Sequence, residues 1–182
     1  MKREVALVTG ASTGIGRACA EQLAAAGFAV YGTARRPGRS SGGVNMIPLD
    51  VRDDNSVMAC VKRVLREAGQ IDVLVNNAGV AMEGAIEETS LEEIRGVMET
   101  NFFGVVRMIR AVLPGMRQRG RGRIRTPVDA VVGERAVEPH LGDEADPRAR
   151  IGRAIVVEVR RDRGRGHRRR RLPGHPGALG SG

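Results

Sequence analysis

Cysteine and long apolar runs are scarce in this 182-residue sequence, and each scarcity excludes a class of protein. The two cysteines, Cys19 and Cys60, form no Cys-x-x-Cys motif and no cluster with histidine, so we expect buried thiols and no metal site. No segment approaches the roughly 18 apolar residues that a membrane-spanning helix needs. The N-terminus passes from Met1–Glu4 into a strand-like segment without the apolar region of a signal peptide, so we expect a cytoplasmic protein.

Lysine, serine and aromatic residues are missing from most of the last third of the chain. Residues 125–182 contain no lysine, no aromatic residue and only Ser181 as a serine, but they hold 13 arginines against 8 acidic residues. We therefore divide the chain near Ile124 into a folded domain, 1–124, and an Arg/Gly/Pro-rich tail, 125–182, which we expect to be poorly ordered. Within that tail, only Ile155–Val157 has the pattern of a strand core.

Residues 1–124 alternate apolar runs with amphipathic segments of helical period. The predicted strands are Glu4–Thr9, Ala29–Ala34, Val44–Leu49, Ile71–Val75 and the start of a fifth at Gly122–Ile124. Three helices are predicted, and the first and the last are Ile15–Ala26 and Ser90–Leu113. The second begins at a cap formed by Asp53 or Asp54 and runs to about Ala68. Its spacing places four apolar residues on one face: Val57, Val61, Val64 and Leu65. Because parallel strands need long crossovers, this alternation predicts an α/β fold with a doubly wound parallel sheet that is Rossmann-like but incomplete.

A glycine-rich segment joins the first predicted strand to the first predicted helix. Residues 9–16 read Thr-Gly-Ala-Ser-Thr-Gly-Ile-Gly, with the spacing Gly-x-x-x-Gly-x-Gly. The first glycine permits a tight turn, the second lets a ligand approach the backbone, and the third lets the helix pack near the sheet. Backbone N–H groups and the helix dipole favour a pyrophosphate at such a turn. We therefore expect cofactor contacts from Gly10, Ser12, Thr13, Gly14, Ile15 and Gly16.

This glycine spacing resembles that of the short-chain dehydrogenase/reductase family, and three later segments resemble the same family in the same order. They are Asp50-Val51 after the third strand, Asn76–Gly79 after the fourth, and Asn101 within Thr100–Gly104. The resemblance implies an acidic contact to the adenine ring at Asp50, beside Val51. It implies a catalytic-set residue at Asn101, and a cofactor cleft lined by Asn77, Ala78 and Gly79.

The end of the second predicted strand bears on the choice of cofactor. NAD-binding proteins of this kind place an acidic residue there, and it hydrogen-bonds the ribose hydroxyls. Here the sequence is Thr33-Ala34-Arg35-Arg36, with no carboxylate. A guanidinium pairs instead with a 2′-phosphate through charge-assisted hydrogen bonds. We therefore predict that NADP is preferred over NAD, with Arg35 and Arg36 as phosphate ligands.

The resemblance also implies an oxidoreductase that interconverts carbonyls and alcohols. In that family a tyrosine exchanges the substrate proton, a lysine four residues later lowers the pKa of the tyrosine, and an upstream serine orients the carbonyl. This chain has none of the three at the expected place. Its only tyrosine is Tyr31 in the second strand, its only lysines are Lys2 and Lys62, and no serine lies between Ser90 and Ser181.

Histidine offers no replacement for the missing tyrosine. His140, His167 and His175 all lie in Pro/Gly/Arg-rich sequence with no predicted element to fix their geometry, so we interpret them as solvated loop residues. Asn101 is then the one remaining member of the catalytic set. We predict a chain that is catalytically inactive and at most binds NADP(H).

The change in composition near Ile124 is the one expected of GC-rich coding DNA read in another frame. We therefore interpret the chain as a truncated or frame-altered oxidoreductase, with impaired homo-oligomerisation and a substrate that the sequence does not specify. A non-catalytic nucleotide-binding protein is one alternative. A nucleic-acid-binding tail built on the arginine tract Arg160–Arg171 is another, but the tract lacks the aromatic residues that stack on bases.

Overall fold

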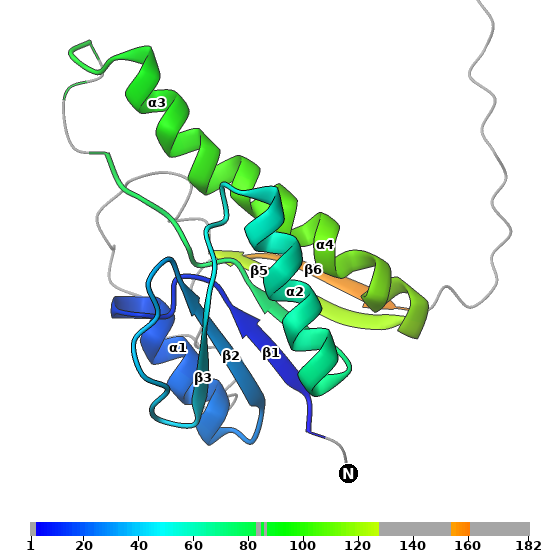
Figure 1. The fold of residues 1–182 in the computed structure, drawn as a ribbon. Coiled ribbons are helices and arrows are strands. Elements are labelled where there is room, and N and C mark those ends of the chain that lie inside the picture. The colour runs from blue at the N-terminus through cyan, green and yellow to red at the C-terminus, as the bar shows by residue number, and fades with distance from the viewer. Residues whose placement is uncertain (1–2, 83–84, 86, 128–153, 161–182) are drawn as a thin grey trace, which may run out of the picture.

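Apolar runs separated by long crossovers form the sheet of this protein, as the sequence predicts. The structure, a computed structural model, describes residues 3–82, 85, 87–127 and 154–160 (Figure 1). The sheet order is β3-β2-β1-β4-β5-β6, in which β1 to β5 are parallel and β6 is antiparallel to β5. The strands are β1 (Val5–Val8), β2 (Ala29–Ala34), β3 (Val44–Pro48), β4 (Val73–Val75), β5 (Arg121–Pro127) and β6 (Ala154–Arg160).

Helices cover both faces of the sheet because each buried strand is apolar on both sides. Along β1, Val5 and Leu7 point into one core cluster, and Ala6 and Val8 point into the other. The helix α1 (Gly14–Ala25) packs on the second cluster, while α2 (Asp54–Ala68) and α4 (Gly104–Arg119) pack on the first (Figure 1). The result is the doubly wound arrangement that the sequence predicts.

The predicted cap of α2 is confirmed, but Cys60 rather than Leu65 completes its buried face. The carboxylate of Asp53 accepts a hydrogen bond from the backbone N–H of Asn55, and the helix ends at Gly69 in a left-handed conformation. Val57, Val61 and Val64 are buried, whereas Leu65 is 38% exposed. Leu65 therefore lies at the rim of the core rather than in it.

The helical run after Ser90 extends further than predicted. It consists of α3 (Leu91–Met98), a π-helical turn η1 (Glu99–Phe103) and α4, which continues through Pro114 to Arg119. Proline costs a helix one hydrogen bond, but Met108, Val112 and Met116 are buried at helical spacing on both sides of it. Their burial keeps the helix intact until Gly120, which has a φ of 67°.

The tail contributes one strand to the described structure. The apolar run around Val156 forms β6, which pairs with β5 from Pro127↔Ala154 to Arg121↔Arg160. This strand contains Ile155–Val157, the part of the tail whose pattern predicted a strand core. The parallel order of the sheet ends at β5, because β6 runs antiparallel to it. The rest of the tail, 128–153 and 161–182, lies outside the described residues, and so do the three histidines.

Both cysteines are free thiols, and only one is fully buried. Cys60 is buried, and this burial raises the pKa of its thiol to about 12, whereas Cys19 is only partly buried. No described helix combines the length and the apolar character needed to cross a membrane. Within the described ranges, no three His, Cys, Asp or Glu side chains come together as they would around a metal ion.

Candidate functional site

The glycine-rich loop between β1 and α1 has the backbone geometry that its glycines allow. Gly10 and Gly14 have φ values of 66° and 55°, in the left-handed region that favours glycine. A Cβ atom on Gly10 would lie 2.9 Å from the Cα atom of Ala78, and one on Gly16 would overlap the Asn77 amide and the Gly10 carbonyl. A Cβ atom on Gly14 would meet nothing within 4 Å, so the loop is open at that residue.

Two side chains tie this loop to the segment that follows β4. The hydroxyl of Thr9 accepts hydrogen bonds from the backbone N–H groups of Asn77 at 3.0 Å and Ala78 at 2.9 Å. In return, the Asn77 amide donates to the carbonyls of Thr9 and Gly10, both at 3.1 Å. The loop and the Asn76–Gly79 segment therefore form one rigid edge at the carboxyl ends of β1 and β4.

The N-terminus of α1 offers backbone donors that no side chain of the helix satisfies. Thr13 is the N-cap residue, but its side chain makes no capping hydrogen bond, and the first turn holds no acidic residue. Ser12, Thr13 and Gly14 are exposed, and Ile15 is 77% exposed. Free N–H groups and the positive end of the helix dipole favour an anion at this place.

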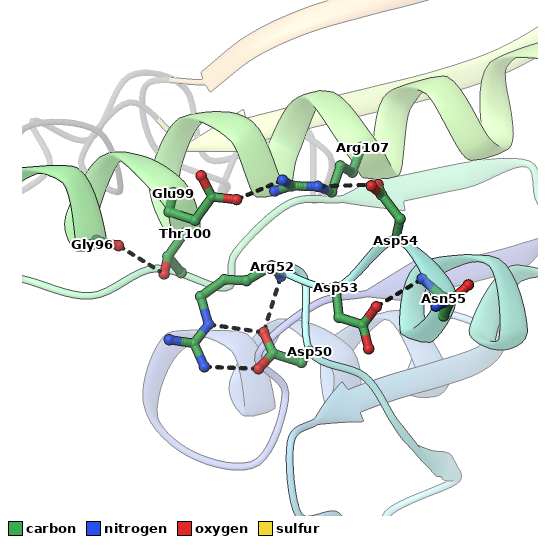
Figure 2. Close-up of polar contacts among 9 residues, drawn as sticks. All are labelled: Asp50, Arg52, Asp53, Asp54, Asn55, Gly96, Glu99, Thr100 and Arg107. Atoms are coloured by element: carbon green, nitrogen blue, oxygen red, sulfur yellow. Dashed lines mark hydrogen bonds and ion pairs between the residues drawn. The ribbon is translucent and has the colours of Figure 1, made fainter.

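Asp50 and Arg52 form an ion pair at the end of β3 (Figure 2). The Arg52 guanidinium donates from Nε and Nη2 to the two carboxylate oxygens of Asp50, at 3.1 and 2.9 Å, and the Arg52 backbone N–H donates at 3.0 Å. The side-chain hydrogen bond from Arg52 is the main reason that the pKa of Asp50 lies below its usual value. The predicted adenine contact is thus a carboxylate already held in place by its neighbour.

A second ion-pair group connects this segment to the helices behind it. In Figure 2, Arg107 of α4 lies between Asp54, at the start of α2, and Glu99, in the π-helical turn. Val51 is buried and packs against α4, where a Cβ atom on Gly104 would lie 2.7 Å from its Cγ2. The Asp50–Val51 segment and η1 are therefore fixed relative to each other.

Asn101 lies inside the π-helical turn and is almost fully buried. Its Oδ1 accepts from the Val80 backbone N–H and its Nδ2 donates to the Val80 carbonyl, both at 2.9 Å. Asn101 therefore fixes the chain just after the Asn76–Gly79 segment. π-Helical turns often occur at functional sites.

The structure brings together most of the residues that the sequence predicts, but not all. Loop residues 10–16, Asn77–Gly79 and Asn101 are connected by the contacts described above, and Arg35 and Arg36 are exposed beyond β2. Tyr31 lies apart in the middle of β2, in the core cluster beneath α2 and α4, and burial raises its pKa. Lys62 is exposed on α2, and Lys2 lies outside the described residues.

Three features of this region were not predicted from the sequence. They are the hydrogen bonds of the Thr9 hydroxyl, the Asp50–Arg52 pair, and the bridge from Arg107 to Glu99 and Asp54. Thr9 and Asn77 are 68 residues apart, so local sequence gives no sign of their contact. The spacing of Asp50 and Arg52 was the one sequence signal for these contacts, because an aspartate and an arginine two residues apart can form an ion pair within a turn.

Similar proteins are known for the part of the chain that contains this region. The short chain dehydrogenase family model matches residues 4–127. A 3-ketodihydrosphingosine reductase of Bacteroides thetaiotaomicron is 46% identical over 124 residues, which cover 68% of this chain and 46% of that protein. The 3-oxoacyl-acyl-carrier-protein reductase FabG of Escherichia coli is 39% identical over 137 residues, which cover 71% of this chain and 56% of that protein.

A solved structure shares the fold. A short-chain dehydrogenase from Streptomyces avermitilis superposes with a TM-score of 0.62 at 44% identity, over 67% of this chain and 47% of that one. The chain spans about half the length of the relatives it matches. Its sheet order, its glycine spacing and the family match over residues 4–127 agree, and this chain belongs to the short chain dehydrogenase family.

Proposed function

We propose that this chain binds NADP(H) across the carboxyl edge of the sheet. The observation that carries the proposal is the glycine-rich loop, which is locked to the Asn76–Gly79 segment and leaves the first turn of α1 open to an anion. The pyrophosphate would contact the backbone of Gly10, Ser12, Thr13, Gly14, Ile15 and Gly16. When bound, the nicotinamide supplies a hydride for carbonyl reduction or accepts one from an alcohol.

The remaining contacts follow from the arrangement of the strand ends. Asp50 and Val51 would border the adenine, and Asn77, Ala78 and Gly79 would line the cleft on the side of β4. The ordered Asp50 carboxylate supports its part in this assignment, because Arg52 already fixes its orientation. These residues, and the proposed cytoplasmic location of the protein, are inferences from the fold and the family.

NADP is the proposed cofactor rather than NAD. Arg35 and Arg36 follow β2 where an acidic residue would contact the ribose hydroxyls of NAD, and both are exposed. Guanidinium groups favour the extra phosphate of NADP. As a supporting case, an actinorhodin polyketide ketoreductase that is 39% identical over 67% of this chain was solved with NADPH.

We further propose that the 182-residue chain does not complete the reaction. Carbonyl reduction needs a proton as well as a hydride, and a positioned general acid must supply it. Asn101 holds the backbone at Val80 and carries no titratable proton. Tyr31 is buried in mid-strand and Lys62 is exposed on α2, so neither stands at the carboxyl edge.

Nicotinamide fluorescence tests the binding proposal directly. Titration of the chain with NADPH and with NADH should give a tighter dissociation constant for NADPH, by about tenfold or more, since a charge-assisted hydrogen bond contributes roughly 1.5–3 kcal/mol. The double variant Arg35→Ala/Arg36→Ala should lose most of that difference and keep its NADH affinity. Equal affinities in the unmodified chain, or no binding of either nucleotide, would contradict the proposal.

A further inference from the structure

Arg107 of α4 has no part in the proposed function as stated so far. Its Nε donates to Oδ1 of Asp54 at 3.1 Å and its Nη2 pairs with Oε1 of Glu99. One guanidinium therefore connects the first turn of α2 with the π-helical turn η1 (Figure 2). The side chain of Asp54 is 82% exposed and that of Glu99 is 39% exposed, so the contact with Glu99 is the more sheltered of the two.

A contribution to stability does not by itself account for this arrangement. An ion pair with a carboxylate as exposed as that of Asp54 adds little to the free energy of unfolding. Nη1 of Arg107 is buried and has no hydrogen-bond partner among the residues that the structure describes, and such a donor is destabilising. The arrangement is better explained by what the guanidinium positions.

On the side of η1, the guanidinium holds the turn that carries Asn101. Glu99 is the first residue of η1, and Asn101 follows two residues later inside the same turn. Asn101 in turn holds both backbone groups of Val80 through its two hydrogen bonds of 2.9 Å. Arg107 therefore acts on Val80 through Glu99 and Asn101.

On the side of α2, Arg107 is anchored close to the proposed adenine position without holding it. The Asp50 backbone N–H donates to the Ser56 hydroxyl, in the first turn of α2, at 2.9 Å, and Arg52 binds the Asp50 carboxylate. Neither contact involves Arg107. Asp54 thus gives Arg107 an anchor on α2, while Asp50 is held by residues of its own segment and helix.

The proposed cofactor position gives this connection a consequence. A dinucleotide with its pyrophosphate at the glycine-rich loop and its adenine beside Asp50 places its nicotinamide on the other side of the loop, toward β4 and the segment that leads to Val80. We propose that Arg107 is a positioning residue for the nicotinamide half of the cofactor. The inference rests on the proposed function, since it assumes that NADP(H) is the ligand. Arg107 acts by fixing the backbone at Val80 and not by touching the nucleotide.

Amide hydrogen exchange of the full 182-residue chain tests the structural step. In Arg107→Gln the Val80 amide should exchange about tenfold faster than in the unmodified chain, because its acceptor on Asn101 is held less firmly. The Ala78 amide, whose acceptor is the Thr9 hydroxyl, should change by less than about twofold. Equal acceleration at both amides would indicate a general loss of stability and would overturn the inference.

Calorimetric titration with NADPH and with 2′,5′-ADP, which lacks the nicotinamide half, tests the effect on binding. Arg107→Gln should weaken NADPH binding by about tenfold and leave 2′,5′-ADP binding unchanged. Glu99→Gln, a change at a more exposed side chain, should give the same loss. The double variant should lose no more than either single variant, because both residues act through one contact. Arg110→Gln is the matched control, since it removes the same charge from an exposed position of the same helix and should bind both ligands normally.

The outcomes separate this inference from the function on which it rests. Unchanged NADPH affinity in Arg107→Gln, or an equal loss for 2′,5′-ADP, would overturn the role of Arg107 and leave the proposed function standing. Additive losses in the double variant would show that Arg107 does not act through Glu99 and would also overturn it. Failure of the unmodified chain to bind either ligand would overturn both.

Discussion

The junction of β1 with β4 and the junction of β5 with β6 lie in one sheet, but different interactions hold them. At the first, the side chains of Thr9 and Asn77 cross between the strand ends and bond backbone groups on the other side. At the second, a backbone ladder aligns seven residue pairs, and the Arg123 side chain of β5 forms an ion pair with Glu4, just before β1, at 2.8 Å. At the β1–β4 junction, side chains therefore reinforce the backbone pairing at the edge where we propose that the cofactor binds, whereas the contacts described at the β5–β6 junction are those of the backbone ladder.

Hydrogen exchange should show the largest contrast between the two junctions. β1 is central, with a strand on each side and helices over both faces, while β6 is the last strand of the described sheet. Amides of Val5–Val8 should therefore exchange at least about a hundredfold more slowly than those of Ala154–Arg160. Equally slow amide exchange in β6 would show that this outer strand is as stable as β1 and would contradict the proposed difference between the two junctions.

Substitution of a helical glycine tests how tightly the β1–β4 junction is packed. Gly16→Ala should destabilise the fold by about 1–3 kcal/mol, because the new methyl group overlaps the Asn77 amide and the Gly10 carbonyl. Gly96→Ala in α3 is the matched control. Its methyl group meets nothing within 4 Å, so it should stabilise the helix by up to about 1 kcal/mol. Urea unfolding measures both, and equal shifts in midpoint would refute the close packing at Gly16.

Paired threonine substitutions compare the β1–β4 junction with the neighbouring junction of β4 and β5. Thr9→Val leaves the Asn77 and Ala78 N–H groups without their acceptor, so we expect a loss of about 1–3 kcal/mol in unfolding free energy. Thr126→Val in β5 removes a single longer bond, the one from the Asn76 amide at 3.3 Å. It should cost less than Thr9→Val by the same measurement. A larger cost at Thr126 would reverse the ranking of the junctions.

The smallest expected effect is on the pH dependence of stability. The folded-state pKa of Asp50 is lowered, so the pair with Arg52 contributes stability above the ordinary aspartate pKa of about 3.9, and the contribution is lost as the pH falls through the lower folded value. Arg52→Ala should therefore destabilise the chain near neutral pH by up to about 1 kcal/mol, as for a partly exposed pair. The difference from the unmodified chain should shrink in acid, and a difference that grows in acid would contradict the assignment.

Periodic patterns predicted the main elements, and contacts distant in sequence account for what they missed. β2 and the capped start of α2 were predicted because their apolar residues and caps lie within a few residues of each other. The extension of α4 past Pro114 was missed because it depends on burial of Met116 in the core. The π-helical turn has no local signature, so the backbone that holds Asn101 was not predicted, although the residue itself was.

The site shows the same division between local and distant information. The glycine spacing pointed to the loop, yet the Thr9 and Asn77 bonds that rigidify it connect residues 68 apart. Arg35 and Arg36 were predicted because they directly follow the end of β2, which the local sequence alone makes visible.

The central claim, that the chain binds its cofactor without completing the reaction, is tested most directly by NADPH oxidation at saturating NADPH. The measurement uses a panel of ketones and aldehydes and a sample whose NADPH binding has been established by fluorescence. We predict substrate-dependent rates at background, since loss of the general acid alone typically costs about 10² to 10⁴ in rate. Substrate-dependent turnover by the 182-residue chain that disappears in Asn101→Ala would contradict the claim.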